Sequence, residues 1–287
     1  MEKIECQSLS SLKSEIEQAR NSFNMGKGDI IVYRGQADED YKFEPSLFRK
    51  KNKNVYKNEA KLLEKIEIER PKDFSNMTTL ERLVKMQSYG FATRILDVTS
   101  DEHVALYFAA QASKKDKNNE QHNGKLFICR IPEKNVKSFD DETVICLVNL
   151  AKLSEDEKKK LAKALQTKRN NEDIVKKFTK IIRAEYPNFE LPKDLDLYTP
   201  VFVHVKKDNP RISAQSGAFI VFGLKDKKFE HIKRKIFIST QTIEAKSKKN
   251  IREQLDEINI NRRTLFPELN AFLVDALKQA RAGNIDF

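Results

Sequence analysis

The sequence is poor in the residues that build disulfide frameworks and metal sites. Its three cysteines, Cys6, Cys129 and Cys146, are odd in number and widely spaced, a pattern that fits neither a disulfide framework nor a zinc knuckle. The four histidines are scattered along the chain, so the sequence predicts no metal site. Reduced, buried thiols explain the cysteine pattern best, and we expect a cytoplasmic protein.

Long apolar runs are missing as well. No stretch of the sequence approaches the roughly eighteen apolar residues that a membrane span needs. The start of the chain has acidic residues within an amphipathic pattern and no apolar signal core, which argues against secretion. Charged residues make up 34% of the chain and hydrophobic residues 39%, a balance that predicts a soluble protein. We expect a single domain over residues 1–287.

The abundant charge is positive on balance. A net charge of +11 favours phosphate-rich partners such as nucleic acids. Much of this charge comes from lysines that alternate with acids, as in Glu157-Lys158-Lys159-Lys160, and such runs are typical of solvated helix faces. Composition alone therefore leaves a nucleic-acid partner and an ordinary basic surface both open.

One stretch, residues 87–111, contains the densest set of structural signals. Residues 94–98 read as a short strand, and Thr99 with Glu102 has the spacing of a capping box, which predicts a helix beginning near Ser100. Apolar residues at helical spacing, among them Val104 and Phe108, would bury one face of that helix. The polar turn between the strand and the helix would then be held in place, as an ordinary helix cap or as a site of chemistry.

A second signal is an arginine at the end of an apolar strand. Residues 29–34 read as a buried strand that ends in Arg34, followed by Gly35 and Gln36. A guanidinium in that setting requires an anion or a carboxylate beside it, because an unpaired buried charge is costly. Gly35 removes side-chain bulk where a ligand or another backbone segment approaches. A bound anion and a structural ion pair both satisfy Arg34.

The rest of the chain alternates between helical and strand patterns. Capping boxes at Thr78 with Glu81 and at Ser154 with Glu157 predict two helix starts, and residues 152–186 read as a charged helical insertion. The fold we expect is α+β, with a mostly antiparallel, split sheet flanked by helices. Its strands are predicted near Ile31, Ile95, Phe127, Phe202, Ile220 and Phe237.

Several of these segments together resemble a known family. In order along the chain they are Tyr33-Arg34-Gly35-Gln36, Pro45 to Arg49, the helix with Glu59, Gln87 to Thr99, Val104 to Ala109, Arg211 to Gly217 and Leu265 to Leu269. This order resembles the signature of the FRG domain, which is named for its Phe/Tyr-Arg-Gly motif. The resemblance runs from about residue 25 to residue 280, apart from the helical insertion.

The order of elements in this family is similar to that of the ADP-ribosyltransferase fold, and this similarity implies NAD as the cofactor. By this resemblance Arg34 would hold NAD, and Thr99 with Ser100 would support the nicotinamide ribose. Residues beside them, namely Gly35, Gln36, Gln87 and Arg94, would complete the cofactor site. That fold supplies a glutamate from a later strand, but the matching segment here offers Gln215.

An amide cannot stabilise the positive charge that develops on the ribose, so another acid has to supply it. Asp97 is our first choice, since Arg34 or Arg94 would keep it ionised, and Glu268 is the other candidate. A plain structural role for Asp97 would be to pair with Arg94.

Two functional hypotheses follow. In the first, the chain is an NAD-dependent ADP-ribosyltransferase-like enzyme that modifies a nucleic acid or a protein. In the second, it is a non-catalytic module that senses a nucleotide or nucleic acid, in bacterial defence or a stress response. A nuclease or hydrolase fits worst, since the sequence shows neither clustered metal-binding carboxylates nor a nucleophile and base at a recognisable spacing.

Overall fold

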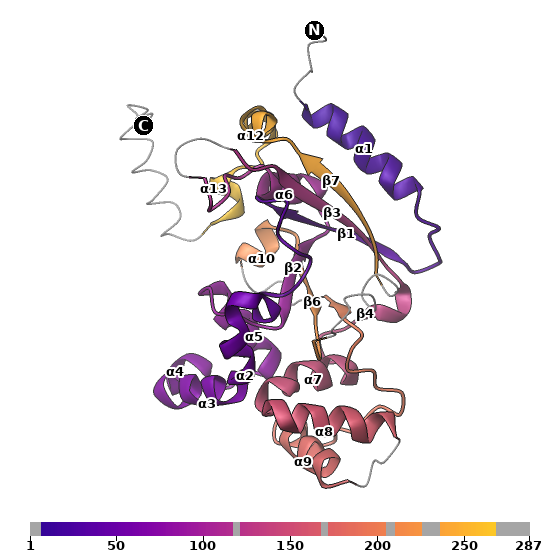
Figure 1. Cartoon of the computed structure of the whole chain (residues 1–287), viewed down its shortest axis with the longest axis vertical. Coiled ribbons are helices and arrows are strands. Elements are labelled where there is room, and N and C mark those ends of the chain that lie inside the picture. The colour runs from indigo at the N-terminus through magenta and orange to yellow at the C-terminus, as the bar shows by residue number, and fades with distance from the viewer. Residues whose placement is uncertain (1–6, 117–120, 168–171, 205–209, 226–235, 268–287) are drawn as a thin grey trace.

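The structure is a computed structural model that describes residues 7–116, 121–167, 172–204, 210–225 and 236–267. Its centre is a seven-stranded sheet with the strand order β4-β5-β6-β2-β1-β3-β7 (Figure 1). The strands are β1 (Ile30–Gln36), β2 (Ile95–Thr99), β3 (Gly124–Ile131), β4 (Val136–Lys137), β5 (Val201–Val203), β6 (Gly217–Val221) and β7 (Phe237–Ile243). The six predicted strands are all present, and β4 was not predicted.

The pairing of the strands differs from the prediction in one respect. Five neighbouring pairs are antiparallel, but β4 runs parallel to β5, with Val136 opposite Phe202. The sheet is therefore mixed, where the sequence predicted a mostly antiparallel one. The difference arises because the chain after β4 passes through a long helical segment before it returns in β5, and such a crossover permits parallel pairing.

The two central strands of the sheet, β1 and β2, have the least backbone pairing. β1 pairs with β2 at a single position, Tyr33 opposite Thr99. On its other side β1 pairs with β3 along its whole length, from Ile30 to Gln36. β2 likewise pairs with β6 over all of its residues. The two halves of the sheet thus share little backbone contact with each other, and they diverge beyond Tyr33.

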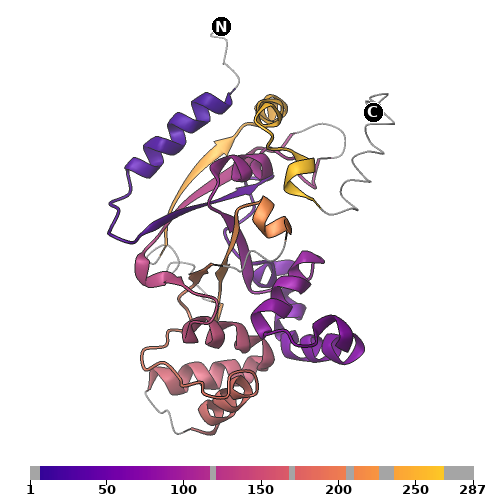
Figure 2. The same cartoon turned by 180° about the vertical axis from the view of Figure 1, so that it is seen from behind.

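Helices cover the sheet and extend from its ends. Before β3 these are α1 (Leu9–Asn21), α2 (Lys53–Lys57), α3 (Glu59–Glu69), α4 (Pro71–Phe74), α5 (Thr79–Ser88) and α6 (Glu102–Ala109). After β3 they are α7 (Glu142–Asn149), α8 (Glu155–Gln166), α9 (Asp173–Arg183), α10 (Pro210–Ala214), α12 (Lys248–Glu257) and α13 (Arg262–Leu265). Figures 1 and 2 show α7, α8 and α9 as a lobe at one end of the molecule, with α1 and α12 at the opposite end.

Two separate groups of helices bury side chains from the sheet. Around β1 and β3, residues such as Tyr33 and Ile128 pack with α1, α6 and α12. Around β5 and β6, residues such as Phe219 pack with α5, α7, α8 and α9. Alternate strand residues such as Val32 and Ile220 form a third cluster with the segment that contains Leu47 and Phe48. The first two clusters meet where β1 and β2 diverge.

Of the three capping boxes predicted from the sequence, two are present and one is not. Those at Thr78 with Glu81 and at Ser154 with Glu157 are present and start α5 and α8, as predicted. The predicted box at Thr99 is wrong, because α6 begins at Glu102 and its N-cap is Asp101. Thr99 cannot cap this helix because it still belongs to β2, where it lies opposite Tyr33.

The helical insertion predicted over residues 152–186 contains α8 and α9. Both helices share a core cluster with β5 and β6, so the lobe is packed against the sheet. Lys158 of α8 reaches Glu59 of α3, whose carboxylate also binds Arg94 at the start of β2. All three of these charged side chains are buried.

That the chain is a single domain stays a prediction. No helix in the described part of the chain is long and apolar enough to cross a membrane.

Candidate functional site

A cavity of about 230 Å³ opens where β1 and β2 diverge and the two core clusters meet. Its walls come from β1, β2, β6, α5, α6 and α10. The structure brings six of the predicted site residues together around this cavity from separate segments of the sequence: Arg34, Gly35, Gln87, Asp97, Thr99 and Gln215. The polar side chains in the wall are Tyr33, Arg34, Gln87, Ser88, Asp97, Thr99, Arg211 and Gln215.

Arg34 bridges the opening between the two strands. Its Nη1 donates a hydrogen bond to the main-chain oxygen of Asp97 and lies 3.9 Å from the carboxylate oxygen Oδ2 of the same residue. The Nε atom of Arg34 is buried and has no hydrogen-bond partner among the described residues. Burial lowers the pKa of the guanidinium and the nearby Asp97 opposes that shift, yet an arginine side chain stays charged in a protein. One donor of a charged group is thus left unpaired in the described part of the chain.

Gly35 holds β1 against α6. A Cβ atom on Gly35 would lie 1.8 Å from the main-chain oxygen of Ala105, so only glycine fits this contact. The neighbouring Gln36, also predicted as a site residue, is buried and donates to the main-chain oxygen of Lys42 at 3.2 Å. It is not part of the cavity wall, because its side chain is used inside the fold.

Asp97 presents an exposed carboxylate at the cavity, with 63% of its side chain accessible to solvent. Its Oδ1 accepts a hydrogen bond of 2.7 Å from Nε2 of Gln87. The Oε1 atom of Gln87 accepts in turn from the hydroxyl of Thr93 at 2.7 Å. Because Gln87 is held from both ends of its amide, it fixes the direction of the Asp97 carboxylate.

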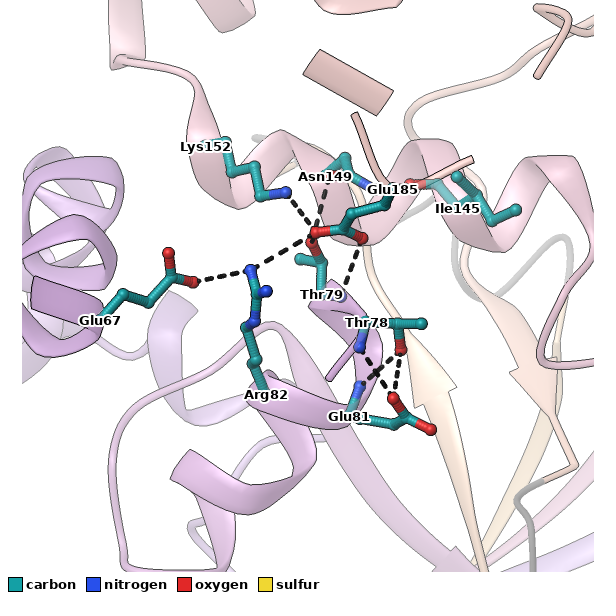
Figure 3. Close-up of polar contacts among 9 residues, drawn as sticks. All are labelled: Glu67, Thr78, Thr79, Glu81, Arg82, Ile145, Asn149, Lys152 and Glu185. Carbon is teal, nitrogen blue, oxygen red and sulfur yellow. Dashed lines mark hydrogen bonds and ion pairs between the residues drawn. The ribbon is translucent and has the colours of Figure 1, made fainter. Parts of the chain in front are cut away.

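Gln87 lies near the end of α5, and the start of this helix is bound by Glu185, which follows α9 (Figure 3). The Glu185 carboxylate accepts from the main-chain nitrogen of Thr79 at 3.0 Å and from the Thr79 hydroxyl at 2.7 Å. Lys152 at 2.5 Å and Arg82 at 3.4 Å complete its partners. Burial alone would raise the pKa of Glu185, but the bonds from Lys152 and Thr79 outweigh that effect and lower it. An ionised Glu185 therefore anchors the first turn of α5, consistent with the positive end of a helix dipole.

The part of the wall at α10 is supported from behind by α13 and Phe266. Gln215 donates from Nε2 to the main-chain oxygen of Leu265 at 3.0 Å, and its own main-chain oxygen accepts from the Thr99 hydroxyl at 2.8 Å. Arg211 lies with its guanidinium carbon 4.8 Å from the centre of the Phe266 ring. A cation–π contact of this kind restrains the arginine beside the cavity. The Thr99 hydroxyl and the Gln215 amide nitrogen are therefore used in hydrogen bonds that hold the wall in place.

Arg211 was missed by sequence reasoning as a site residue. It lies within one of the family-like segments, Arg211 to Gly217, yet no role had been assigned to it. The signal was its place directly after the Asn209-Pro210 pair and four residues before Gln215, because a spacing of four puts two residues on the same face of a helix. The structure thus adds a second guanidinium to the cavity wall.

Two other predicted site residues, Arg94 and Ser100, do not line the cavity, and a third, Glu268, was also predicted. Arg94 is buried away from it, with Nε 3.0 Å from Oε1 of Glu59 and two further bonds to the main-chain oxygens of Phe222 and Gly223. The expected pairing of Arg94 with Asp97 is therefore wrong, because Arg94 precedes β2 and its side chain is buried against Glu59, whereas the Asp97 carboxylate is exposed. Ser100 is exposed and donates its main-chain N–H to Ser216. Glu268 lies outside the described residues.

The site is suited to an anionic ligand. Two guanidiniums and one carboxylate face a single cavity, which is otherwise lined by apolar side chains such as Val84 and Phe108. Arginines bind phosphate through paired N–H donors, and the Nε donor of Arg34 is unpaired among the described residues. Among the residues that the structure describes, no group of three or more histidine, cysteine or acidic side chains is placed to hold a metal ion.

Comparison with protein families gives one match. Residues 29–118 match the model of the FRG domain. The matched segment contains Arg34, Gln87, Asp97 and Thr99, four of the residues that line the cavity. The family resemblance predicted from the sequence is therefore confirmed, and the chain contains an FRG domain. No curated protein and no solved structure matches the chain.

Proposed function

We propose that this chain, which carries an FRG domain over residues 29–118, binds NAD or a related nucleotide in the cavity and transfers its ADP-ribosyl group to an acceptor. The observation that carries the proposal is the pairing of Arg34 with Asp97. A buried guanidinium with an unused donor lies beside an exposed carboxylate in one cavity. The Arg34 guanidinium suits a phosphate group, and the Asp97 carboxylate suits a sugar that becomes positively charged.

The side chains around the cavity fit such a ligand. Arg34 and Arg211 are placed to bind the phosphate oxygens, because both guanidiniums belong to the cavity wall. The apolar residues Val84, Val104 and Phe108 offer a surface for a flat ring. A cavity of about 230 Å³ is too small to enclose a whole dinucleotide, so part of the ligand would remain outside it.

The proposed reaction breaks the glycosidic bond between C1′ of the ribose and the nicotinamide nitrogen. The electron pair of that bond leaves with nicotinamide, which becomes a neutral ring, and C1′ gains positive charge. A lone pair from an oxygen or nitrogen of the acceptor then forms a new bond to C1′, and the acceptor releases its proton to solvent. Asp97 stabilises the positive charge on the sugar because it is the one acidic residue among the described residues of the cavity wall.

The proposal is tested by calorimetry with NAD and by measuring nicotinamide release from labelled NAD, with candidate nucleic-acid and protein acceptors present. We expect NAD to bind, and Arg34→Ala to weaken binding strongly. Asp97→Asn should retain binding and lose nicotinamide release. Arg70→Ala is the matched control, because Arg70 pairs with Asp73 on the surface and is 71% exposed. If NAD does not bind and no nicotinamide is released, the proposal is wrong.

A second function, a non-catalytic nucleotide sensor, is favoured by one specific observation. The Asp97 carboxylate already accepts a hydrogen bond from Gln87 and lies beside Arg34, and these partners offset part of its negative charge. A weaker carboxylate would bind a ribose without driving the transfer. This function predicts NAD binding that survives Asp97→Asn, with no nicotinamide released by either protein. A role in bacterial defence or a stress response stays a prediction for both functions.

A further inference from the structure

A short segment on the surface has an unusual concentration of positive charge. Residues 49–57 contain five basic side chains and no acidic one. We call this segment the basic strip. No ion pair or hydrogen bond among the described residues involves any of these five side chains. Elsewhere many of the lysines pair with acids, so the strip differs from an ordinary charged surface. Its basic residues are Arg49, Lys50, Lys51, Lys53 and Lys57.

The backbone of the strip is held firmly against the protein. The ring of Tyr56 packs edge-on against Phe48, with the ring centres 5.6 Å apart. Asn52 donates from Nδ2 to the main-chain oxygen of Ser46 at 2.6 Å. Val55 adds an apolar contact to the core cluster beneath the sheet. With the apolar side chains turned inward, the four lysines of the strip are exposed to solvent.

The strip is joined to the wall of the candidate site through Thr93. The main-chain oxygen of Thr93 accepts from the nitrogen of Leu47 at 3.1 Å, and its nitrogen donates to the hydroxyl of Ser46 at 3.1 Å. The Thr93 hydroxyl donates to Gln87, which holds Asp97. Ser46 and Leu47, which come shortly before the strip, are therefore hydrogen-bonded to the residue that holds Gln87 at the cavity wall.

Charge also connects the strip with the site. Burial is the main cause that lowers the pKa of Arg34, and the positive charge of Arg49 adds to the effect. Positive charges that act on each other in this way favour an anion in their neighbourhood. The strip thus extends the positive charge of the cavity outward along the surface.

We propose that the basic strip is a docking surface for the phosphate backbone of a nucleic acid. A series of unpaired lysines on a rigid backbone fits a series of phosphates, and lysine contacts of this type are independent of base sequence. The binding itself does not depend on the proposed transferase function. The further idea that the docked nucleic acid is the acceptor does rest on that function.

The composition of the strip favours a nucleic acid over an anionic membrane. Segments that bind membranes pair their basic residues with exposed apolar side chains that enter the lipid. In the strip the two apolar residues, Val55 and Tyr56, pack inward on the protein. The remaining residues, Asn52 and Asn54, are polar and suit contacts with phosphate and sugar groups.

The test measures fluorescence anisotropy of labelled single-stranded DNA, single-stranded RNA and duplex DNA of about 20 nucleotides, over salt concentrations from about 50 to 300 mM. The variant replaces Lys50, Lys51, Lys53 and Lys57 with glutamine. Each lost phosphate contact lowers the slope of log K against log salt by about 0.7 for single strands and about 0.9 for duplex DNA. We expect the slope to become shallower by about 3 units, with affinity at low salt reduced at least about 100-fold.

A matched control variant removes the same charge from lysines that have acidic partners. Lys65, Lys159, Lys177 and Lys249 each pair with a glutamate on the surface, and all four would be changed to glutamine. We expect the control to keep most of its affinity for nucleic acid. An equal loss in both variants would show that net charge alone drives binding, and would overturn the proposal. Circular dichroism and thermal unfolding verify that both variants fold.

Two further outcomes also overturn the proposal. One is the absence of binding to all three nucleic acids at low salt. The other is binding of vesicles rich in phosphatidylserine that exceeds nucleic-acid binding and requires the four lysines. Failure of the proposed NAD function can be told apart from failure of the strip proposal. If only the NAD function fails, the Arg34→Ala variant still binds nucleic acid. Conversely, the strip variant would still bind NAD, since none of its four lysines lines the cavity.

Discussion

Arg34 and Asp97 meet where two central strands separate. The guanidinium of Arg34 donates to the main-chain oxygen of Asp97 and lies 3.9 Å from its carboxylate, so one arginine contacts both the backbone and the side chain of its neighbour. The bond to the backbone spans the opening between β1 and β2, which share the single pair Tyr33 and Thr99. The cavity is therefore built around this contact.

Arg34→Lys tests whether the shape of the guanidinium matters in addition to its charge. A lysine keeps one positive charge but has no equivalent of the Nε donor that Arg34 leaves unpaired. We expect the affinity for NAD to fall about 10-fold to 100-fold, in line with the loss of a charge-assisted hydrogen bond. Calorimetry measures the affinity, and urea unfolding verifies that the protein remains folded. An unchanged affinity would show that Nε does not contact the ligand.

Gly35→Ala tests the contact between β1 and α6. The new methyl carbon would lie 1.8 Å from the main-chain oxygen of Ala105, and neither backbone can move without disturbing the core. We expect a loss of at least about 2 kcal/mol in the free energy of unfolding, measured by urea titration. Gly90→Ala is the control, since no atom lies within 4 Å of its Cβ position and only its positive φ of 82° costs about 1 kcal/mol. Equal losses in the two variants would contradict this explanation.

Glu59→Gln tests the buried group of Glu59, Arg94 and Lys158. Burial alone would raise the pKa of Glu59, but Arg94 and Lys158 outweigh that effect and lower it, so the carboxylate is ionised. Without its negative charge two buried cations lose their partner, and we expect a loss of about 3 to 5 kcal/mol in unfolding free energy. Glu69→Gln, which breaks an exposed pair with Lys65, should cost less than about 0.5 kcal/mol. A small effect at Glu59 would mean that water reaches this group.

Glu185→Gln tests how the anchor of α5 depends on pH. The pKa of Glu185 is lowered in the folded protein, so its stabilising effect is complete above the unfolded value of about 4.3 and is lost as pH falls through the folded value. We expect the variant to be about 1 to 3 kcal/mol less stable near pH 7. This difference should shrink as the pH falls below about 4.

Urea unfolding of both proteins between about pH 7 and pH 3 measures the effect, with exposed Glu190→Gln as the control. A difference that stays constant over this range would show that the charge of Glu185 does not anchor the helix. Because α5 also holds Gln87, we expect NAD affinity to fall in parallel with the loss of the anchor.

The predicted strands succeeded because their apolar residues are consecutive or alternate, and most lie between clear turns. Such patterns are local, so they are readable without tertiary contacts. β4 has two residues and forms because β5 lies beside it, which no local pattern reveals. The same limit explains the mixed sheet, since the direction of pairing depends on the path of the chain between β4 and β5.

The start of α6 shows how two local signals compete. Thr99 and Glu102 have the spacing of a capping box, but Asp101 is one residue before the helix and caps it with a bond of 2.8 Å to the nitrogen of His103. The strand pairing of Thr99 decided between them. Pairing between distant segments was not available from the sequence, so the competing cap could not be ruled out.

The candidate site was predictable in part. The strand-end arginine and the polar turn were visible in the sequence, and the family resemblance linked Arg34, Asp97 and Gln215 to one place. The partner of Arg94 was not visible, because Glu59 comes from a distant helix.

The tight contact between Gly35 and Ala105 also limits how this cavity can be redesigned. The wall made by β1 and α6 has no spare volume, so enlarging a side chain there disrupts folding before it changes the choice of ligand. Val84 and Ser88 of α5 line another part of the cavity wall. Libraries that aim to alter which nucleotide is accepted should therefore vary these two positions and leave the glycine untouched.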